Sequence, residues 1–145
     1  MKKYMLDTNI FNRLLDGSID LNILSDKTCY ATHVQHDELR AVKEVQRRLN
    51  LEKIFSEVLT EQLPTQSVIL DVSRLDEAYL GDGDLYQQVL EALDQRNKAK
   101  SNNEQDALIA ETALVCGLTL VTEDRHLREV VAEIDGEVCG IVDLL

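Results

Sequence analysis

Four acidic side chains stand where a sheet protein can gather them into one site. Asp7 follows a short apolar run, and Asp124 comes shortly after a second apolar run at residues 118–121. Ligands bind outside the carboxyl ends of parallel strands, so acids at two such ends can converge. Asp106 lies in the first or second turn of an expected helix, and Glu38 lies near the start of another. The spacing therefore predicts one acidic pocket.

Carboxylates gathered in this way favour a divalent cation. Without cations their mutual repulsion is costly, and a hard cation removes that cost. Mg²⁺ prefers oxygen ligands, keeps several waters and shares its coordination shell with substrate phosphate. Two such ions can activate a water and stabilise the leaving oxygen of a phosphodiester. These residue types therefore fit hydrolytic phosphoryl chemistry, for which no serine, cysteine or histidine nucleophile is needed.

Each acid also has a purely structural interpretation, and spacing alone leaves both open. Asp7 and Asp124 could each cap the helix that follows. Asp106 near a helix N-terminus suits the helix dipole, and Glu38 could face solvent on an amphipathic helix. Two of the four positions could also be shifted by one residue. Asp37 has the same chemistry as its neighbour Glu38, and Glu123 the same as its neighbour Asp124.

Length and composition bound the class of protein. At 145 residues the chain has the size of a single domain, residues 1–145, and 44% hydrophobic residues supply a core. No apolar run is long enough to span a bilayer, and the N-terminus reaches Asp7 too early for a signal peptide. The cysteines form no CxxC pair and are expected as reduced core residues of a cytoplasmic protein: Cys29, Cys116 and Cys139.

The formal net charge of −12 bears directly on the choice of partner. Taken alone it argues against nucleic-acid binding, because phosphate contacts need Lys and Arg. The acidic excess could be solvated surface, or part of it could form a cation site that attracts phosphate once loaded. It could also attract a basic protein.

Apolar periodicity predicts an alternation of strands and helices. The expected strands are residues 4–6, 29–31, 118–121 and 138–142, and the expected helices are 8–15, 34–59, 85–98, 103–116 and 123–133. Residues 68–70 are either a short strand or the extended entry to a helix. Residues 101–104 form a capping-box pattern, Gly117 is a helix stop, and turns are expected at 81–83 and 135–136. This alternation favours an α/β fold, with a parallel sheet covered by helices on both faces.

Four motifs resemble those of the PIN domain family, and in particular the VapC-type toxins of bacterial toxin–antitoxin pairs. They are residues 6–9 (LDTN), 37–39 (DEL), 105–113 (QDALIAETA) and 120–124 (LVTED). The stretch 106–127 is the most specific, and residues 60–102 carry little resemblance. Many toxin relatives have a glycine shortly after the helix acid, whereas this chain has Leu39-Arg40-Ala41-Val42 after Glu38.

The resemblance implies a PIN-like α/β/α sandwich with a central parallel sheet of four or five strands. It implies an endoribonuclease in which Mg²⁺ or Mn²⁺ activates a water that attacks single-stranded or looped RNA, leaving a 5′-phosphate and a 3′-hydroxyl. The implied metal ligands are Asp7 and Asp106 directly, with Glu38 and Asp124 partly through water, while Asn9 and Thr122 orient ligands or water. It further implies a homodimer and a cognate antitoxin with a basic, often Arg-containing, C-terminal segment.

Two other functions remain open on the sequence. The fold could serve as a catalytically silent RNA- or protein-binding module that retains the motifs. A receiver-like phosphoacceptor domain also holds Mg²⁺ at strand ends, but it requires a Lys after its last strand, and no Lys follows Lys100.

Basic residues near the acidic motifs also have two interpretations. Arg40, Lys43 and Arg47, with Arg48 beside them, could form an RNA-facing stripe on the helix expected at 34–59. Alternatively they form a solvated face paired with Glu44 and Glu52. Two further arginines could contact phosphate or an acidic neighbour: Arg13 and Arg125.

Overall fold

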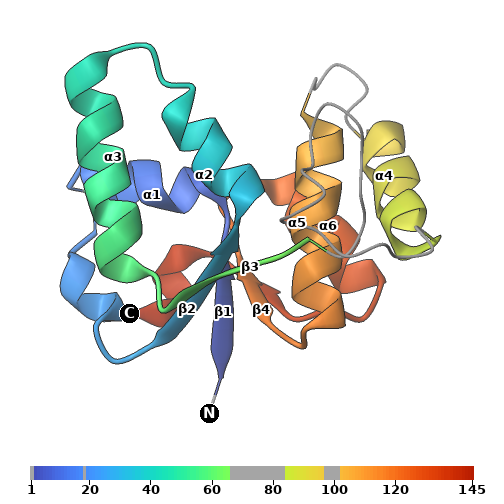
Figure 1. The fold of residues 1–145 in the computed structure, drawn as a ribbon. Helices are drawn as coiled ribbons and strands as arrows, with labels where there is room; N and C mark the ends of the chain where they lie inside the picture. Colours follow the sequence, from blue (N-terminus) through green and yellow to red (C-terminus); the bar gives the residue numbers. More distant parts are fainter. Residues whose placement is uncertain (1, 18, 66–83, 97–101) are drawn as a thin grey trace.

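A five-stranded, wholly parallel sheet organises the chain. The computed structural model describes residues 2–17, 19–65, 84–96 and 102–145. The strands lie in the order β3-β2-β1-β4-β5 (Figure 1). Their bounds are Lys3–Leu6 for β1, Thr28–Thr32 for β2, Glu61–Leu63 for β3, Thr119–Val121 for β4 and Val138–Cys139 for β5. The predicted α/β class is confirmed, and the strand number is the higher of the two expected.

Helices cover both faces of this sheet. Helices α1 and α3 lie on one side, and α4, α5 and α6 lie on the other (Figure 1). The helices are α1 (Thr8–Leu15), α2 (His33–Arg40), α3 (Val45–Val58), α4 (Asp84–Arg96), α5 (Asn103–Val115) and α6 (Arg125–Glu133). Two short 3₁₀ segments are η1 (Leu21–Leu24) and η3 (Ile141–Leu144). No helix in the described ranges is long and apolar enough to cross a membrane.

Alternating strand residues divide the core into two clusters. Met5 and Leu120 pack with α4, α5 and α6, whereas Leu6 and Val121 pack with α1 and α3. All four side chains are fully buried. Successive side chains of a strand point to opposite faces, so each short strand contributes to both clusters. The central strands β1 and β4 are therefore covered on both faces, which explains why residues 4–6 and 118–121 are mainly apolar.

The order of the strands places the carboxyl ends of β1 and β4 at a topological switch point. From β1 the chain moves to β2 and β3 on one side, and it later returns to β4 on the other side of β1. Leu6 is paired with Val121, so the two strands end level with each other. The Asp7 N–H donates to the Val121 carbonyl at 2.9 Å and extends the ladder by one bond. Crevices at such points are the usual ligand sites of open parallel sheets.

The helix predicted for residues 34–59 is wrong, because the chain forms two helices there. Helix α2 ends at Arg40 and α3 begins at Val45. The Glu44 side chain accepts from the N–H groups of Gln46 and Arg47 at 3.0 and 2.9 Å, so it caps a new helix start. Glu38 consequently lies in the last turn of a short helix, not near the start of a long one.

Further predictions need correction at element ends. The strand expected at 138–142 ends at Cys139, after which Gly140 opens η3. The N-cap of α5 is Asn102, without a side-chain cap bond, and Ser101 of the expected capping box lies outside the described residues. Of the three cysteines only Cys29 is buried, and Cys116 is exposed. The alternatives for residues 68–70 and the turn at 81–83 lie outside the described residues, and β3 was not predicted.

Gly117 ends α5 as predicted. Its φ of +68° lies in the left-handed region, which costs a glycine little. The Leu118 N–H then donates to the Ala113 carbonyl at 2.8 Å, which is the 6→1 hydrogen bond of a Schellman motif. This stop turns the chain directly into β4, so α5 runs antiparallel to β4 and begins at the edge of the sheet where the strands end.

Candidate functional site

Asp7 is the first residue after β1, and its carboxylate is buried, with 5% exposure. Oδ1 accepts from the Thr8 N–H at 2.7 Å, which makes Asp7 the N-cap of α1. Oδ2 accepts from Asn9 Nδ2 at 3.2 Å and from the Thr122 hydroxyl at 2.6 Å. The helix-capping interpretation of Asp7 is therefore correct as structure. A carboxylate has about four lone-pair sites, so capping leaves it able to serve as a ligand as well.

Thr122 connects the segment after β1 with the segment after β4 through hydrogen bonds. Its fully buried hydroxyl donates to Asp7, and the same oxygen accepts from the Asp124 N–H at 3.1 Å and from Asn9 Nδ2 at 3.3 Å. The Asn9 carbonyl oxygen accepts in turn from the Glu123 N–H at 3.2 Å. The two residues expected to be accessory, Asn9 and Thr122, thus form a bridge between the ends of β1 and β4.

Asp124 and its neighbour Glu123 have separate structural roles. Asp124 is the N-cap of α6, and its Oδ1 accepts from the Leu127 N–H at 3.1 Å. Glu123 instead forms an ion pair with Arg13 of α1, with 2.8 Å between Oε1 and Nη1. Of these two acids, Asp124 is the one whose backbone N–H donates a hydrogen bond to the Thr122 hydroxyl.

Glu38 reaches the site from the other neighbour of β1. It lies on α2, which follows β2, and its Oε1 accepts from the Thr8 hydroxyl at 3.0 Å. Thr8 is also the residue whose N–H binds Asp7. Glu38 and Asp7 are therefore connected through one threonine, and this geometry favours Glu38 over Asp37 as the site acid.

Asp106 lies at the start of α5 and is buried, with 3% exposure. Glu104 in the same first turn is exposed, and an exposed acid would satisfy the helix dipole equally well. Burying a carboxylate is costly unless its surroundings compensate, so the helix dipole alone does not explain Asp106. Helix α5 begins at the edge where the strands end and contacts both β1 and α2 (Figure 1). Asp106 thus belongs to the same edge as Asp7.

The donor chemistry fits a hard divalent cation, although the described side chains form no ready-made cage. Within the described residues, no three His, Cys, Asp or Glu side chains are grouped closely enough to hold a metal ion. Mg²⁺ is commonly held by only one or two carboxylates, with waters and substrate phosphate as the other ligands. Asp7 and Asp106, two buried carboxylates at one edge of the sheet, supply oxygen donors of this type.

Two polar residues that support the site were missed in the sequence. Thr8 binds both Asp7 and Glu38, and its place directly after an acid at a strand end was the available signal. Gln35 is fully buried, and its Nε2 donates to the Leu6 carbonyl at 3.0 Å. Its Oε1 accepts from the Thr32 N–H at 2.9 Å, within the capping box of α2. The bond from Gln35 to the Leu6 carbonyl connects α2 to the end of β1, and no local sequence pattern indicates it.

The stripe of basic residues does not form one helical face. Arg40 on α2 binds Glu52, with 3.1 Å between Nε and Oε1, as one interpretation expected. Arg47 on α3 binds Asp16 at 2.8 Å, and this hydrogen bond lowers the pKa of Asp16. In the described part of the chain Glu44 forms no ion pair with these arginines, because its carboxylate caps α3 and accepts from the backbone N–H of Arg47.

The family model for the PIN domain matches residues 4–133. The chain belongs to the PIN domain family. The match spans β1 to α6 and includes every element that positions the acids described above. No curated protein matches the sequence of this PIN domain.

Several solved structures share this PIN fold at low sequence identity. A chain from VapBC2 of Rickettsia felis, crystallised with a promoter DNA fragment, aligns with a TM-score of 0.61 at 19% identity, covering 94% of this chain and 97% of that one. PAE2754 from Pyrobaculum aerophilum aligns with a TM-score of 0.61 at 18% sequence identity, covering 99% of this chain and 92% of that one. A chain from DNA-bound VapBC of Salmonella typhimurium aligns with a TM-score of 0.60 at 17% sequence identity, covering 97% of this chain and 98% of that one. At such identities the likeness establishes the fold.

The strand order of this PIN domain also removes the receiver-like alternative. Receiver domains have the order 2-1-3-4-5, in which the chain crosses to the other side of the sheet after its second strand. Here the order is β3-β2-β1-β4-β5, so the crossing comes after β3 and the switch point lies between β1 and β4.

Proposed function

We propose that this PIN domain is a Mg²⁺- or Mn²⁺-dependent endoribonuclease that hydrolyses RNA phosphodiesters. The proposal depends chiefly on one observation. The Thr122 hydroxyl, 2.6 Å from Asp7, joins that buried carboxylate to the backbone of Asp124 at the switch point of the sheet. Family membership supports the same chemistry, because PIN domains are commonly nucleases that bind divalent metals.

The side chains divide into holding and orienting groups. Asp7 and Asp106 would hold the cation directly, and Glu38 and Asp124 would complete its surroundings through water. Asn9 and Thr122 each donate to Oδ2 of Asp7 and so set the orientation of that carboxylate. When bound, the cation supplies a Lewis acid for the phosphoryl oxygen and lowers the pKa of a water to the neutral range.

The finer proposal is that the chain is a VapC-type toxin of the cytoplasm. Its support is the shared fold with chains of VapBC structures, which contain a toxin and an antitoxin. A net charge of −12 suits an antitoxin whose basic C-terminal segment reaches the acidic edge, since an Arg can bind a carboxylate through two parallel bonds. The expected homodimer belongs to this proposal too.

A catalytically silent PIN module remains the second candidate. The observation in its favour is that Asp7 and Asp124 both serve as N-caps, so helix starts alone could account for them. RNA or partner binding without turnover in any divalent metal would support this function.

Charge-neutral variants of the two buried acids test the proposal. Asp7→Asn and Asp106→Asn are expected to abolish cleavage of 5′-labelled single-stranded RNA in Mg²⁺ or Mn²⁺, while circular dichroism stays that of the wild type. Asp26→Asn is the matched control, because Asp26 is exposed and its ion pair among the described residues is with neighbouring Lys27 at 3.2 Å. Calorimetric titration with Mn²⁺ should show binding that Asp106→Asn loses. Full activity in both variants would overturn the assignment.

A further inference from the structure

A groove with two arginines lies beside the candidate site. This α6–β5 groove is a shallow depression of about 370 Å³ between α6 and β5, open to solvent. The charged side chains that line it are Arg125, Arg128, Glu129 and Asp143, and Gly140 forms part of its wall. The two arginines lie three residues apart on α6, so both reach the same side of the helix.

The acidic side chains of this groove have more hydrogen-bond and ion-pair partners than its arginines. Glu129 is shared, with Arg96 Nε at 3.5 Å and Arg125 Nε at 3.7 Å. Asp143 accepts from the Gly140 N–H at 2.9 Å, which caps η3. Arg128 is half-buried and forms no ion pair within 4 Å in the described part of the chain. A half-buried arginine without an ion pair keeps its guanidinium available to an anion from outside, in a chain with 27 acidic and 15 basic residues.

Arg128 lies next to the acidic edge of the sheet. A Cβ built on Gly140 would lie 3.0 Å from Arg128 Nη1 and 3.1 Å from Glu123 Oε2, so both side chains converge on the space that this glycine leaves. Glu123 precedes Asp124 in sequence, and Arg125 follows it. Arg128 in the groove therefore lies close to Glu123, the sequence neighbour of Asp124.

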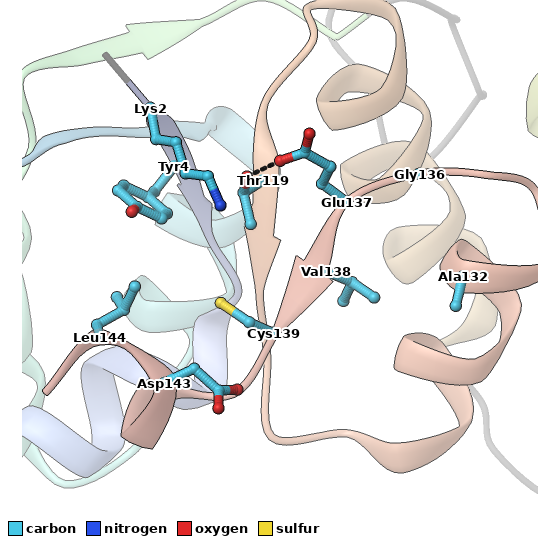
Figure 2. A pocket seen from close by; sticks show the side chains of 10 residues that line it. All are labelled: Lys2, Tyr4, Thr119, Ala132, Gly136, Glu137, Val138, Cys139, Asp143 and Leu144. Carbon is cyan, nitrogen blue, oxygen red and sulfur yellow. Dashed lines mark hydrogen bonds between the residues drawn. The ribbon is translucent and has the colours of Figure 1, made fainter.

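A second hollow continues the groove along β5. It encloses about 420 Å³ and shares Ala132, Val138, Cys139 and Asp143 with the α6–β5 groove (Figure 2). Its cation is Lys2, before β1, and its acids are the shared Asp143 and Glu137, which accepts from the Thr119 hydroxyl at 2.9 Å. The two hollows together form one track from Arg125 to Lys2.

We propose that the α6–β5 groove binds the phosphodiester backbone of the RNA strand next to the cleaved bond, with Arg128 as its main contact and Arg125 as its second. The inference rests on the proposed function and assigns a path to its substrate. A planar guanidinium binds two phosphate oxygens at once, and a cation at this place offsets the repulsion between RNA and an acidic protein. Lys2 would contact strands long enough to reach the second hollow.

RNA binding by the full-length protein tests this path independently of cleavage. The probe is a fluorescent single-stranded RNA, and the readout is its anisotropy over a range of salt, measured in Ca²⁺ in place of Mg²⁺ or Mn²⁺. Arg128→Gln should raise the Kd about tenfold or more, and it should lower the slope of log Kd against log salt by about 0.7 for one lost phosphate contact. Arg128→Lys should recover part of the affinity. Lys53→Gln on α3 removes the same charge from an exposed site and should change neither quantity.

The outcomes separate this proposal from the nuclease assignment. If the wild type cleaves and binds RNA while Arg128→Gln leaves Kd, salt slope and KM unchanged, the groove is not the path although the nuclease stands. Absence of RNA binding by the wild type would overturn the path as well. If Arg128→Gln weakens binding and raises KM with kcat retained, the path is supported, whereas Asp106→Asn should remove kcat.

Discussion

The hydroxyl of Thr122 lies 2.6 Å from Oδ2 of Asp7, although 115 positions of sequence separate the two residues. Because the hydroxyl proton points to Asp7, the lone pairs of the same oxygen accept from Asn9 and from the Asp124 N–H. One side chain thus orients the carboxylate at the end of β1 and anchors the start of α6.

Removing this hydroxyl should impair catalysis more than folding. Thr122→Val keeps the branched shape but loses a hydrogen bond to a carboxylate, of the kind worth about 1.5–3 kcal/mol. We expect kcat/KM for RNA to fall about 10- to 100-fold, measured by single-turnover cleavage with the far-UV spectrum as a check. Thr122→Ser should keep most of the activity. Wild-type cleavage by a folded Thr122→Val protein would show that the bond is dispensable.

The ion pair between Arg13 and Glu123 should contribute little to stability. Its side chains are 43% and 23% exposed, so solvent screens their attraction despite the 2.8 Å distance. A double-mutant cycle with Arg13→Gln and Glu123→Gln, measured by urea unfolding, should give a coupling of about 1 kcal/mol or less. The exchanged pair Arg13→Glu with Glu123→Arg should restore what either single exchange loses. A coupling several times larger would mean that the pair is desolvated.

Gln35 should be important for stability because it is buried and bonded at both ends of its amide. Gln35→Leu leaves the Leu6 carbonyl and the Thr32 N–H without these partners, which should cost about 1–3 kcal/mol in the free energy of unfolding. Gln46→Leu, at an exposed position of α3, is the control, and its free energy of unfolding should stay within about 0.5 kcal/mol of that of the wild type. Equal urea midpoints for the two variants would contradict the assigned role.

Tyr86 should make the fold sensitive to alkali. Burial, followed by the negative charges of Glu104, Asp94 and Glu111, raises the pKa of Tyr86 from 10.0 to about 12. The unfolded chain therefore loses this proton first, so the contribution of Tyr86 to stability is intact below pH 10 and is lost as the pH rises towards 12.

Tyr86→Phe isolates this effect. Burial also raises the pKa of Cys29 to about 11, so the wild type loses stability through both groups in overlapping pH ranges. The free energy of unfolding of Tyr86→Phe should fall less steeply between pH 9 and 11.5 than that of the wild type. Parallel curves would show that Tyr86 does not contribute.

Local patterns were sufficient where the apolar period and the helix stop agreed. β1, α1 and α5 follow from short apolar runs and from Asp16-Gly17 and Gly117, which stop helices by backbone conformation alone. They failed between α2 and α3, because apolar spacing continues across residues 41–44 while the Glu44 side chain caps a new start. They failed again at β5, where a five-residue apolar run keeps only two residues in the sheet.

The sequence by itself determined the fold class and which acids follow strand ends, because both depend on the order and period of neighbouring residues. Only the tertiary structure decided that Thr122 binds Asp7, that the Thr8 hydroxyl binds Glu38, and that Arg128 lines a groove between α6 and β5. These contacts join residues far apart in the chain. They depend on the level ends of β1 and β4, the antiparallel course of α5 and the glycine at position 140, and no single segment encodes that arrangement.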